Sequence, residues 1–170
     1  WFVAAANGIP WLLLVASAAG SLCGIQAVRE LNIRTARYNW ERIATDGVIG
    51  LFTGWFIALT GNAVSILLTH WAWDLWIPED IWALVGIAAV TWVGAYLCMT
   101  ERGRISIAFG IAVGFVGIMI ARLFGDHHSI WVAIVSGCCA FVLLLVTENR
   151  RYRIRHAENR AARGLATEFD

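Results

Sequence analysis

The chain has 170 residues, of which 59% are hydrophobic and 15% are charged. Soluble domains contain roughly 45–50% apolar and about 25% charged residues, so this composition indicates a membrane protein and argues against a soluble globular domain. The formal net charge is only +1. The positions of the charges therefore tell us more than their sum does.

Five apolar stretches are long enough, or nearly so, to cross a bilayer core, which needs about 20 mostly apolar residues in a helix. We predict an all-α fold in which residues 1–170 form one integral membrane domain. The first residue is Trp1 rather than methionine, so we expect the natural chain to begin further upstream. The predicted spans cover residues 2–27, 47–70, 81–100, 105–124 and 130–147, with a polar segment at 28–46 and a polar tail at 148–170.

The arginines predict the orientation of these spans. Twelve of the thirteen follow the first, third or fifth span, and Arg122 is the exception. The positive-inside rule assigns that side to the cytoplasm. We therefore expect an outer N-terminus, a cytoplasmic C-terminus with a basic helix, and a location in the cell (inner) membrane. The residues predicted to contact anionic lipid phosphates are Arg34, Arg37, Arg150, Arg151, Arg153 and Arg155.

Nucleic acid is not an expected partner. A short basic run directly after a span is what membrane topology requires. The tail also carries acidic residues, including Glu148 and Glu158. Its arginines are therefore explained by lipid and topology.

Small residues recur at helical spacing in every predicted span. In lipid, such residues let helix backbones approach closely, and this contact holds helices together. Two uses stay open: packing within one chain, or contact of at least one stripe with another subunit or a second copy. The predicted packing or oligomer face consists of Gly50, Gly54, Gly61, Gly110, Gly114 and Gly117.

Ionisable residues are missing from the middle of all five predicted spans. This pattern argues against a proton-coupled transporter and against acid–base catalysis inside the membrane. We find no catalytic motif either, so we expect no enzymatic activity, and the sequence does not identify a cofactor. Among the neutral polar residues, Asn62, Ser65 and Thr69 form a strip toward the end of the second span. This strip either bonds to a neighbouring helix or lines a pathway.

One cluster in the predicted outer layer has metal-ligand chemistry. His70, Asp74, His127 and His128 belong to two loops at the same interface. Imidazoles and carboxylates bind zinc, copper or iron. The alternative is ordinary polarity at a membrane boundary. The same layer predicts an interfacial aromatic belt of Trp71, Trp73, Trp76, Trp82 and Trp131.

Three functions are compatible with these features. The leading hypothesis is a non-catalytic scaffold or accessory subunit of a membrane complex or homo-oligomer, whose partners are lipids and other subunits or copies of itself. The second is an oligomeric channel or pore, similar to a holin in the broad functional sense. The third is a metal- or cofactor-binding membrane protein that uses the histidines.

Overall fold

The structure is a computed structural model, and it describes residues 9–33, 47–70, 78–100, 105–125 and 128–163. Five α-helices make up this part of the chain, and all five are long and apolar enough to cross a membrane. The prediction of an all-helical fold with five candidate membrane spans is thereby confirmed. The helices are α2 (Pro10–Ile33), α4 (Val48–His70), α5 (Glu79–Thr100), α6 (Ile105–Phe124) and α7 (Ile130–Ala162).

Two helices continue past the ends of the predicted spans. The first span was predicted to end at residue 27, but α2 runs to Ile33. The fifth was predicted to end at residue 147, but α7 runs unbroken to Ala162. Neither extension contains glycine or proline, so nothing in the backbone stops the helix. Hydropathy marks where a membrane ends, whereas these helices continue beyond that point.

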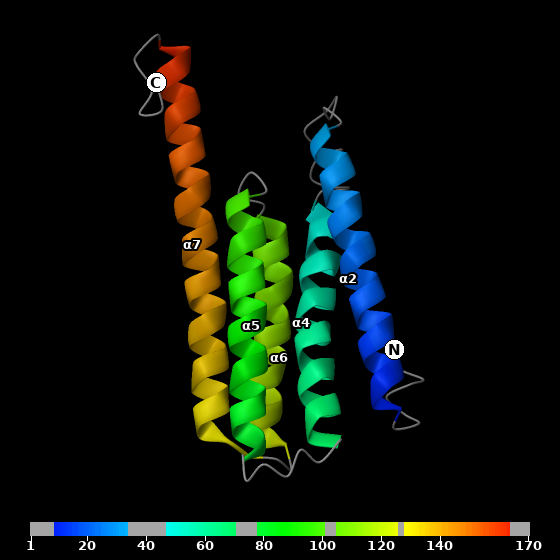
Figure 1. Ribbon diagram of the computed structural model, residues 1–170. Coiled ribbons are helices and arrows are strands. Elements are labelled where there is room, and N and C mark those ends of the chain that lie inside the picture. Colours follow the sequence, from blue (N-terminus) through cyan, green and yellow to red (C-terminus); the bar gives the residue numbers. More distant parts are fainter. Residues whose placement is uncertain (1–8, 34–46, 71–77, 101–104, 126–127, 164–170) are drawn as a thin grey trace.

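Helices that follow one another run in opposite directions (Figure 1). The α4 helix packs against α2, α5 and α6, while α7 packs against α5 and α6. At one end, which we call the Asp80 end, α4 and α6 finish and α5 and α7 begin. At the opposite end, α7 projects beyond α4, α5 and α6 (Figure 1). The bundle is thus centred on α4 and α6, with α2 against one side of α4.

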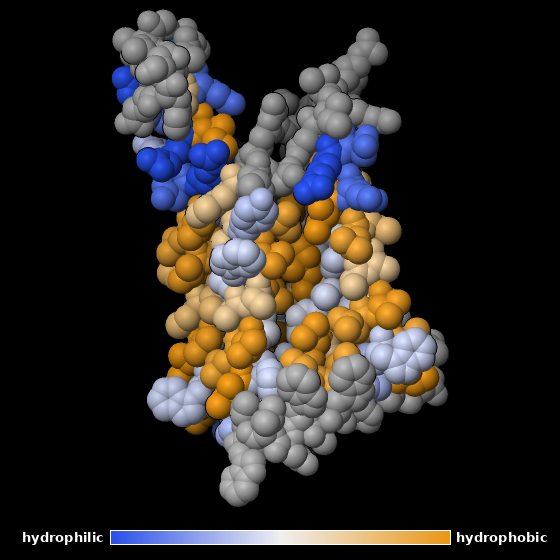
Figure 2. All heavy atoms as spheres, viewed as in Figure 1, coloured by the Kyte–Doolittle hydropathy of each residue, from blue (hydrophilic) through white to orange (hydrophobic). Residues whose placement is uncertain are grey.

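Buried aliphatic and aromatic side chains fill the centre of the bundle. Ile107, Ile111 and Phe115 of α6 are each no more than 1% exposed, and they belong to one core with Ile87 of α5 and Leu143 of α7. Large apolar side chains also cover much of the outer surface, where Trp92 is 74% exposed (Figure 2). Such an extensive apolar exterior suits hydrocarbon rather than water.

The α4 and α6 helices cross at glycines. A Cβ added to Gly54 would lie 2.9 Å from the backbone nitrogen of Ile111 and still closer to the carbonyl oxygen of Ile107. A Cβ added to Gly110 would meet the α4 backbone in the same way, 2.9 Å from the nitrogen of Trp55. The two backbones are therefore in direct contact, as small residues permit.

The other predicted packing glycines differ in their surroundings. Gly50 faces the side chain of Ser106 across the same α4–α6 interface, and Gly114 faces Ala58. Gly61 faces Val90 of α5. Gly117 has no atom within 4 Å of an added Cβ. Five of the six glycines thus lie at helix contacts within this chain, and Gly117 does not.

Candidate functional site

A cavity of about 370 Å³ lies between α4, α5 and α6. The exposure of its lining residues changes along the bundle. Thr69 and Glu79, near the Asp80 end, are exposed, and Asn62 is half-buried. Farther along, Val90 is 6% exposed and Phe115 only 1%. The cavity therefore opens near the Asp80 end and closes against buried side chains deeper in the bundle.

The depth of the cavity can be judged along α5. Glu79 and Val90 both line the cavity. At a rise of about 1.5 Å per residue, they lie about 16 Å apart along the axis of α5. That length is about half of a hydrocarbon core roughly 30 Å thick. The cavity is thus a blind recess that reaches about halfway through the bundle.

The α4 and α6 helices diverge beside the cavity. They touch at Gly54 and Gly110, but Gly117, two turns after Gly110, has open space around it. A smaller hollow of about 240 Å³ follows the same divergence and shares Asn62 and Arg122 with the main cavity. The glycine crossing near one end therefore leaves room between the helices toward the other.

The predicted polar strip lines this cavity. Thr69 Oγ1 donates a hydrogen bond to the carbonyl oxygen of Ser65 at 3.0 Å, and Ser65 Oγ donates to those of Gly61 at 3.1 Å and Trp82 at 3.3 Å. The bonds to Ser65 and Gly61 stay within α4, as is common for hydroxyls in helices, whereas the bond to Trp82 reaches the neighbouring helix α5. The side chain of Asn62 has no hydrogen-bond partner within the described part of the chain. Its amide is therefore the group in the strip that is available to a ligand.

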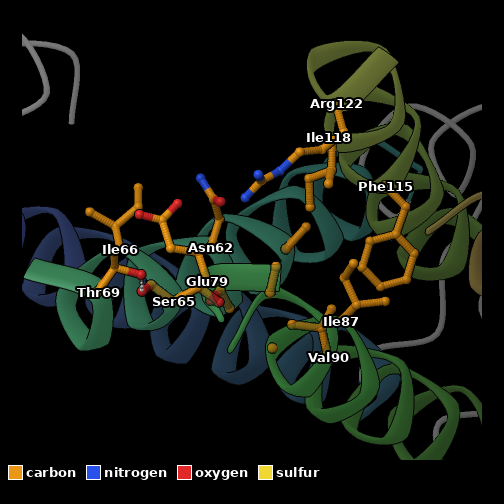
Figure 3. Close-up of a pocket in the computed structure, with 14 residues that line it drawn as sticks. Asn62, Ser65, Ile66, Thr69, Glu79, Ile87, Val90, Phe115, Ile118 and Arg122 are labelled. Carbon is orange, nitrogen blue, oxygen red and sulfur yellow. Dashed lines mark hydrogen bonds between the residues drawn. The ribbon is translucent and has the colours of Figure 1, made fainter. Parts of the chain in front are cut away.

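Two charged side chains line the cavity beside Asn62. Glu79 comes from the first turn of α5 and Arg122 from the last turn of α6. Figure 3 shows the polar ends of Asn62, Glu79 and Arg122 directed toward one another across the cavity. An amide, a carboxylate and a guanidinium from three helices thus meet at one place.

Asp80 fixes the helix ends around this group. Its Oδ2 accepts a hydrogen bond of 2.9 Å from Ser129 Oγ, which directly precedes α7. Its Oδ1 lies 3.8 Å from Arg122 Nη1. The main-chain carbonyl of Arg122 accepts a hydrogen bond of 3.1 Å from the backbone nitrogen of Ser129. Asp80 therefore connects α5, α6 and α7 at the edge of the cavity.

The deep part of the cavity is apolar. Ile87, Val90, Phe115 and Ile118 surround it, and the first three are buried. Because the charged and amide groups lie only at the shallow part, polarity falls along the bundle axis. An occupant that matches this lining has a polar head and an apolar tail.

Most of the predicted metal cluster lies outside the described residues. Asp74 and His127 fall there, and the side chain of His70 is not described either. His128 is exposed, and its ring nitrogen Nδ1 lies 3.1 Å from the carbonyl oxygen of Arg122. Within the described ranges, no group of three or more His, Cys, Asp or Glu residues is arranged to hold a metal ion.

The predicted aromatic belt is described at two positions. Trp131 is 73% exposed in the first turn of α7. Trp82 is half-buried in the first turn of α5. Both lie at the Asp80 end. The other belt residues, Trp71, Trp73 and Trp76, lie outside the described residues.

Some of the predicted lipid-contacting arginines also lie outside the described residues. Arg34 and Arg37 lie outside the described residues, and the other four lie on the projecting part of α7. Arg151 Nη1 is 3.8 Å from Glu148 Oε2, one turn away on the exposed helix. Since α7 projects along the bundle axis (Figure 1), its arginines lie at increasing distances from the apolar part of the bundle.

The sequence analysis missed Arg122 and Glu79 as site residues. Arg122 is the one arginine on the side of the predicted spans where the other charged residues are acidic. Glu79 lies in the first turn of α5, where the helix dipole alone favours a carboxylate, so its position does not by itself indicate a site. The sequence feature that could have identified Arg122 as a site residue is its position among acidic residues, away from the other arginines.

Comparison with known proteins gives no matching family model, no significantly similar curated protein and no significantly similar solved structure.

Proposed function

We propose that this chain is a non-catalytic protein of the cell membrane that binds a small amphipathic molecule in the cavity between α4, α5 and α6. One observation carries this proposal: the lining changes from Glu79, Arg122 and Asn62 at the shallow part to Val90 and Phe115 at the deep part. A bilayer leaflet likewise has a polar headgroup layer above an apolar core about 15 Å deep. A molecule oriented like a lipid therefore matches the cavity along its whole depth.

The volume of the cavity limits the size of the molecule that it can hold. Small-molecule sites commonly have volumes of roughly 300–1,000 Å³, and this cavity of about 370 Å³ lies near the lower limit. The occupant we propose is therefore a single-chain amphiphile, or the headgroup and one chain of a larger lipid.

The arginine distribution supports an orientation for this cavity. With the arginine-rich extension of α7 in the cytoplasm, the Asp80 end lies on the outer side. The cavity then opens in the outer leaflet. The N-terminal side of α2 lies on the same outer side, as the sequence predicts.

Binding agrees with the geometry better than conduction does. The polar strip of Asn62, Ser65 and Thr69 was a candidate pathway, and it does line the cavity. A conducting path needs to continue across the bilayer, however, and buried Phe115 and Val90 lie where this one would continue. The geometry of the single bundle therefore favours a binding recess.

Photo-crosslinking tests the proposal. The probe is a single-chain phosphocholine amphiphile with a diazirine at its chain end, in liposomes that contain the purified protein. We expect saturable crosslinks to the α5 and α6 peptides around Val90 and Phe115, which excess unlabelled amphiphile suppresses. Ala83→Phe, which fills the cavity, abolishes this labelling, whereas Ala89→Phe on the exposed side of α5 does not. Equal labelling of both variants and the wild type contradicts the proposal.

A scaffold role is the second candidate, and the shape of α7 favours it. The part from Glu148 to Ala162 continues the span as one helix and projects beyond α4, α5 and α6 (Figure 1). Ile154 and Ala157 are half-buried on this extension, one turn apart. We propose that they dock a helix of another subunit.

Ile154→Asp tests that role, with Arg153→Asp, at a neighbouring exposed position, as its matched control. We expect only Ile154→Asp to reduce the native size and remove co-purifying subunits after mild detergent extraction. An unchanged size and subunit composition contradicts the scaffold role.

A further inference from the structure

We infer that the molecule bound in the cavity has an uncharged head, whose hydroxyl and carbonyl groups pair with the side-chain amide of Asn62. This inference rests on the proposed function and adds the chemical class of the ligand. Asn62 lines both the main cavity and the smaller hollow between α4 and α6. Its amide points into the space between the helices, where a ligand can reach it (Figure 3).

The amide of Asn62 has unused hydrogen-bonding capacity. It offers two N–H donors and a carbonyl oxygen, and no described residue bonds to it. The hydroxyls of Ser65 and Thr69 differ from it, because both already donate to backbone carbonyls. A polar group without a partner costs free energy in an apolar environment. A ligand that both donates and accepts a hydrogen bond removes that cost.

The charged residues at the mouth of the cavity already have partners. Arg122 Nη1 lies 3.8 Å from Asp80 Oδ1, and Asp80 Oδ2 accepts a hydrogen bond of 2.9 Å from Ser129 Oγ. Glu79 and Arg122 each have a further interaction within the chain. A charged group on the ligand would compete with these contacts, and a charge that leaves water without a counter-charge is costly. The mouth therefore favours an uncharged head.

The depth of Asn62 also favours an uncharged head. The apolar span of α4 ends at Thr69, which lies seven residues beyond Asn62, about 10 Å along the helix axis. A bilayer leaflet contains about 15 Å of hydrocarbon, so the backbone of Asn62 lies well inside the apolar layer. A formal charge at that depth is costly. A hydroxyl or an ester carbonyl loses much less on leaving water and regains a hydrogen bond from the amide.

An ester of glycerol with one fatty acid has the required groups. Its head carries hydroxyl donors, an ester carbonyl acceptor and no charge, and its single chain suits the limited volume of the cavity, about 370 Å³. Ile87, Val90 and Phe115 line the apolar part that takes the chain. A diacylglycerol presents the same head chemistry on two chains, so both belong to the class of ligand that we infer.

Competition against the photoprobe tests the head. Four unlabelled competitors have chains of equal length and different heads: monododecanoylglycerol is uncharged, dodecylphosphocholine zwitterionic, dodecyl phosphate anionic and dodecyltrimethylammonium cationic. We expect the uncharged competitor to suppress labelling at an about tenfold lower concentration than each of the other three, because it alone pairs with the amide without bringing a charge to that depth. Didodecanoylglycerol in a parallel arm distinguishes the two sources of this head: equal competition assigns the site to a two-chain lipid, and weaker competition assigns it to a single-chain ligand.

Asn62→Leu tests the contact itself, because it replaces the amide by methyl groups. We expect the tenfold advantage of the uncharged competitor to disappear in this variant. Each competitor partitions into the liposomes equally for both proteins, so a change in the ranking of the competitors reports the amide. Thr91→Val is the matched control, since it removes a hydroxyl of α5 that does not line the cavity and that donates to the carbonyl oxygen of Ile87 at 2.7 Å. It should retain the advantage. If Asn62→Leu does not fold, Asn62→Ala, which also lacks the amide, takes its place.

The outcomes separate this inference from the proposed function. If a charged or zwitterionic head competes as well as the uncharged head while Ala83→Phe still abolishes labelling, the inference is overturned and the proposed function stands. The same holds if the advantage of the uncharged head persists in Asn62→Leu. If Ala83→Phe changes nothing, the proposed function itself fails.

Discussion

Gly54 and Gly110 face each other where α4 and α6 cross, and neither position has room for a side chain. A Cβ on Gly54 would contact the α6 backbone at Ile107 and Ile111, and a Cβ on Gly110 would contact the α4 backbone. Backbone atoms cannot rotate away as the end of a flexible side chain can. This crossing therefore fixes the distance between the two helices that later diverge around the cavity.

We expect Gly54→Ala to destabilise the bundle by about 1–3 kcal/mol, the usual cost of overpacking a close contact. Gly117→Ala is the matched control, because an added Cβ there meets no atom within 4 Å. Thermal unfolding in one detergent, followed by circular dichroism, measures both variants. Equal melting temperatures for the two would show that the helices are not in backbone contact.

Asp80→Ala removes the connection between the ends of α5, α6 and α7. Ser129 loses its 2.9 Å partner and Arg122 loses a carboxylate at 3.8 Å. We expect a loss of about 1–2 kcal/mol, mostly from the hydrogen bond, because half-exposed ion pairs contribute little. The melting temperature of the variant in detergent measures this loss.

Glu158→Ala serves as the control for that substitution. It removes an acidic residue from the exposed extension of α7, so its melting temperature should match that of the wild type. If Asp80→Ala also melts at the wild-type temperature, Asp80 does not hold the helix ends together.

How far the sequence predicts the fold can be judged from the glycines and from α7. Spacing placed Gly50, Gly54, Gly110 and Gly114 on helix faces, because an α-helix repeats every 3.6 residues. Spacing does not say which faces meet, so packing within the chain and contact with another subunit were both open. The structure pairs the α4 and α6 faces within one chain.

The cavity could not be predicted from the sequence, and the reason is a different one. Asn62 and its strip were visible as a polar stripe on one helix, but Glu79 and Arg122 are separated by 43 positions along the chain. Only the arrangement of α4, α5 and α6 brings them to one place. A hollow also depends on where two helices diverge, which the open space around Gly117 reveals and local periodicity does not.

The extension of α7 predicts that its arginines contact lipid unequally. Arg150 and Arg151 follow Thr147 by three and four residues, about 5–6 Å along the helix axis. Arg160 lies about 20 Å beyond Thr147, past a headgroup layer of roughly 5–8 Å. Arg150 and Arg151 therefore reach the phosphates without bending of the helix, whereas Arg160 does not.

We expect the double variant Arg150→Gln/Arg151→Gln to weaken the association of anionic lipids by about 1 kcal/mol per charge. The matched double variant Arg160→Gln/Arg163→Gln removes the same charge and should have little effect. Native mass spectrometry of the protein with phosphatidylglycerol in mixed micelles counts the bound lipids. Equal losses in both double variants would mean that the extension lies along the membrane surface.

Cysteine labelling tests the orientation that places the cavity in the outer leaflet. His128 is exposed at the Asp80 end and Glu158 is exposed on the extension of α7, so they report on opposite sides. In a background where the four native cysteines are replaced by alanine, a membrane-impermeant maleimide added to intact cells should label His128→Cys. It should label Glu158→Cys only after permeabilisation, because the arginine-rich side remains in the cytoplasm. The reverse pattern would invert the topology and place the cavity in the inner leaflet.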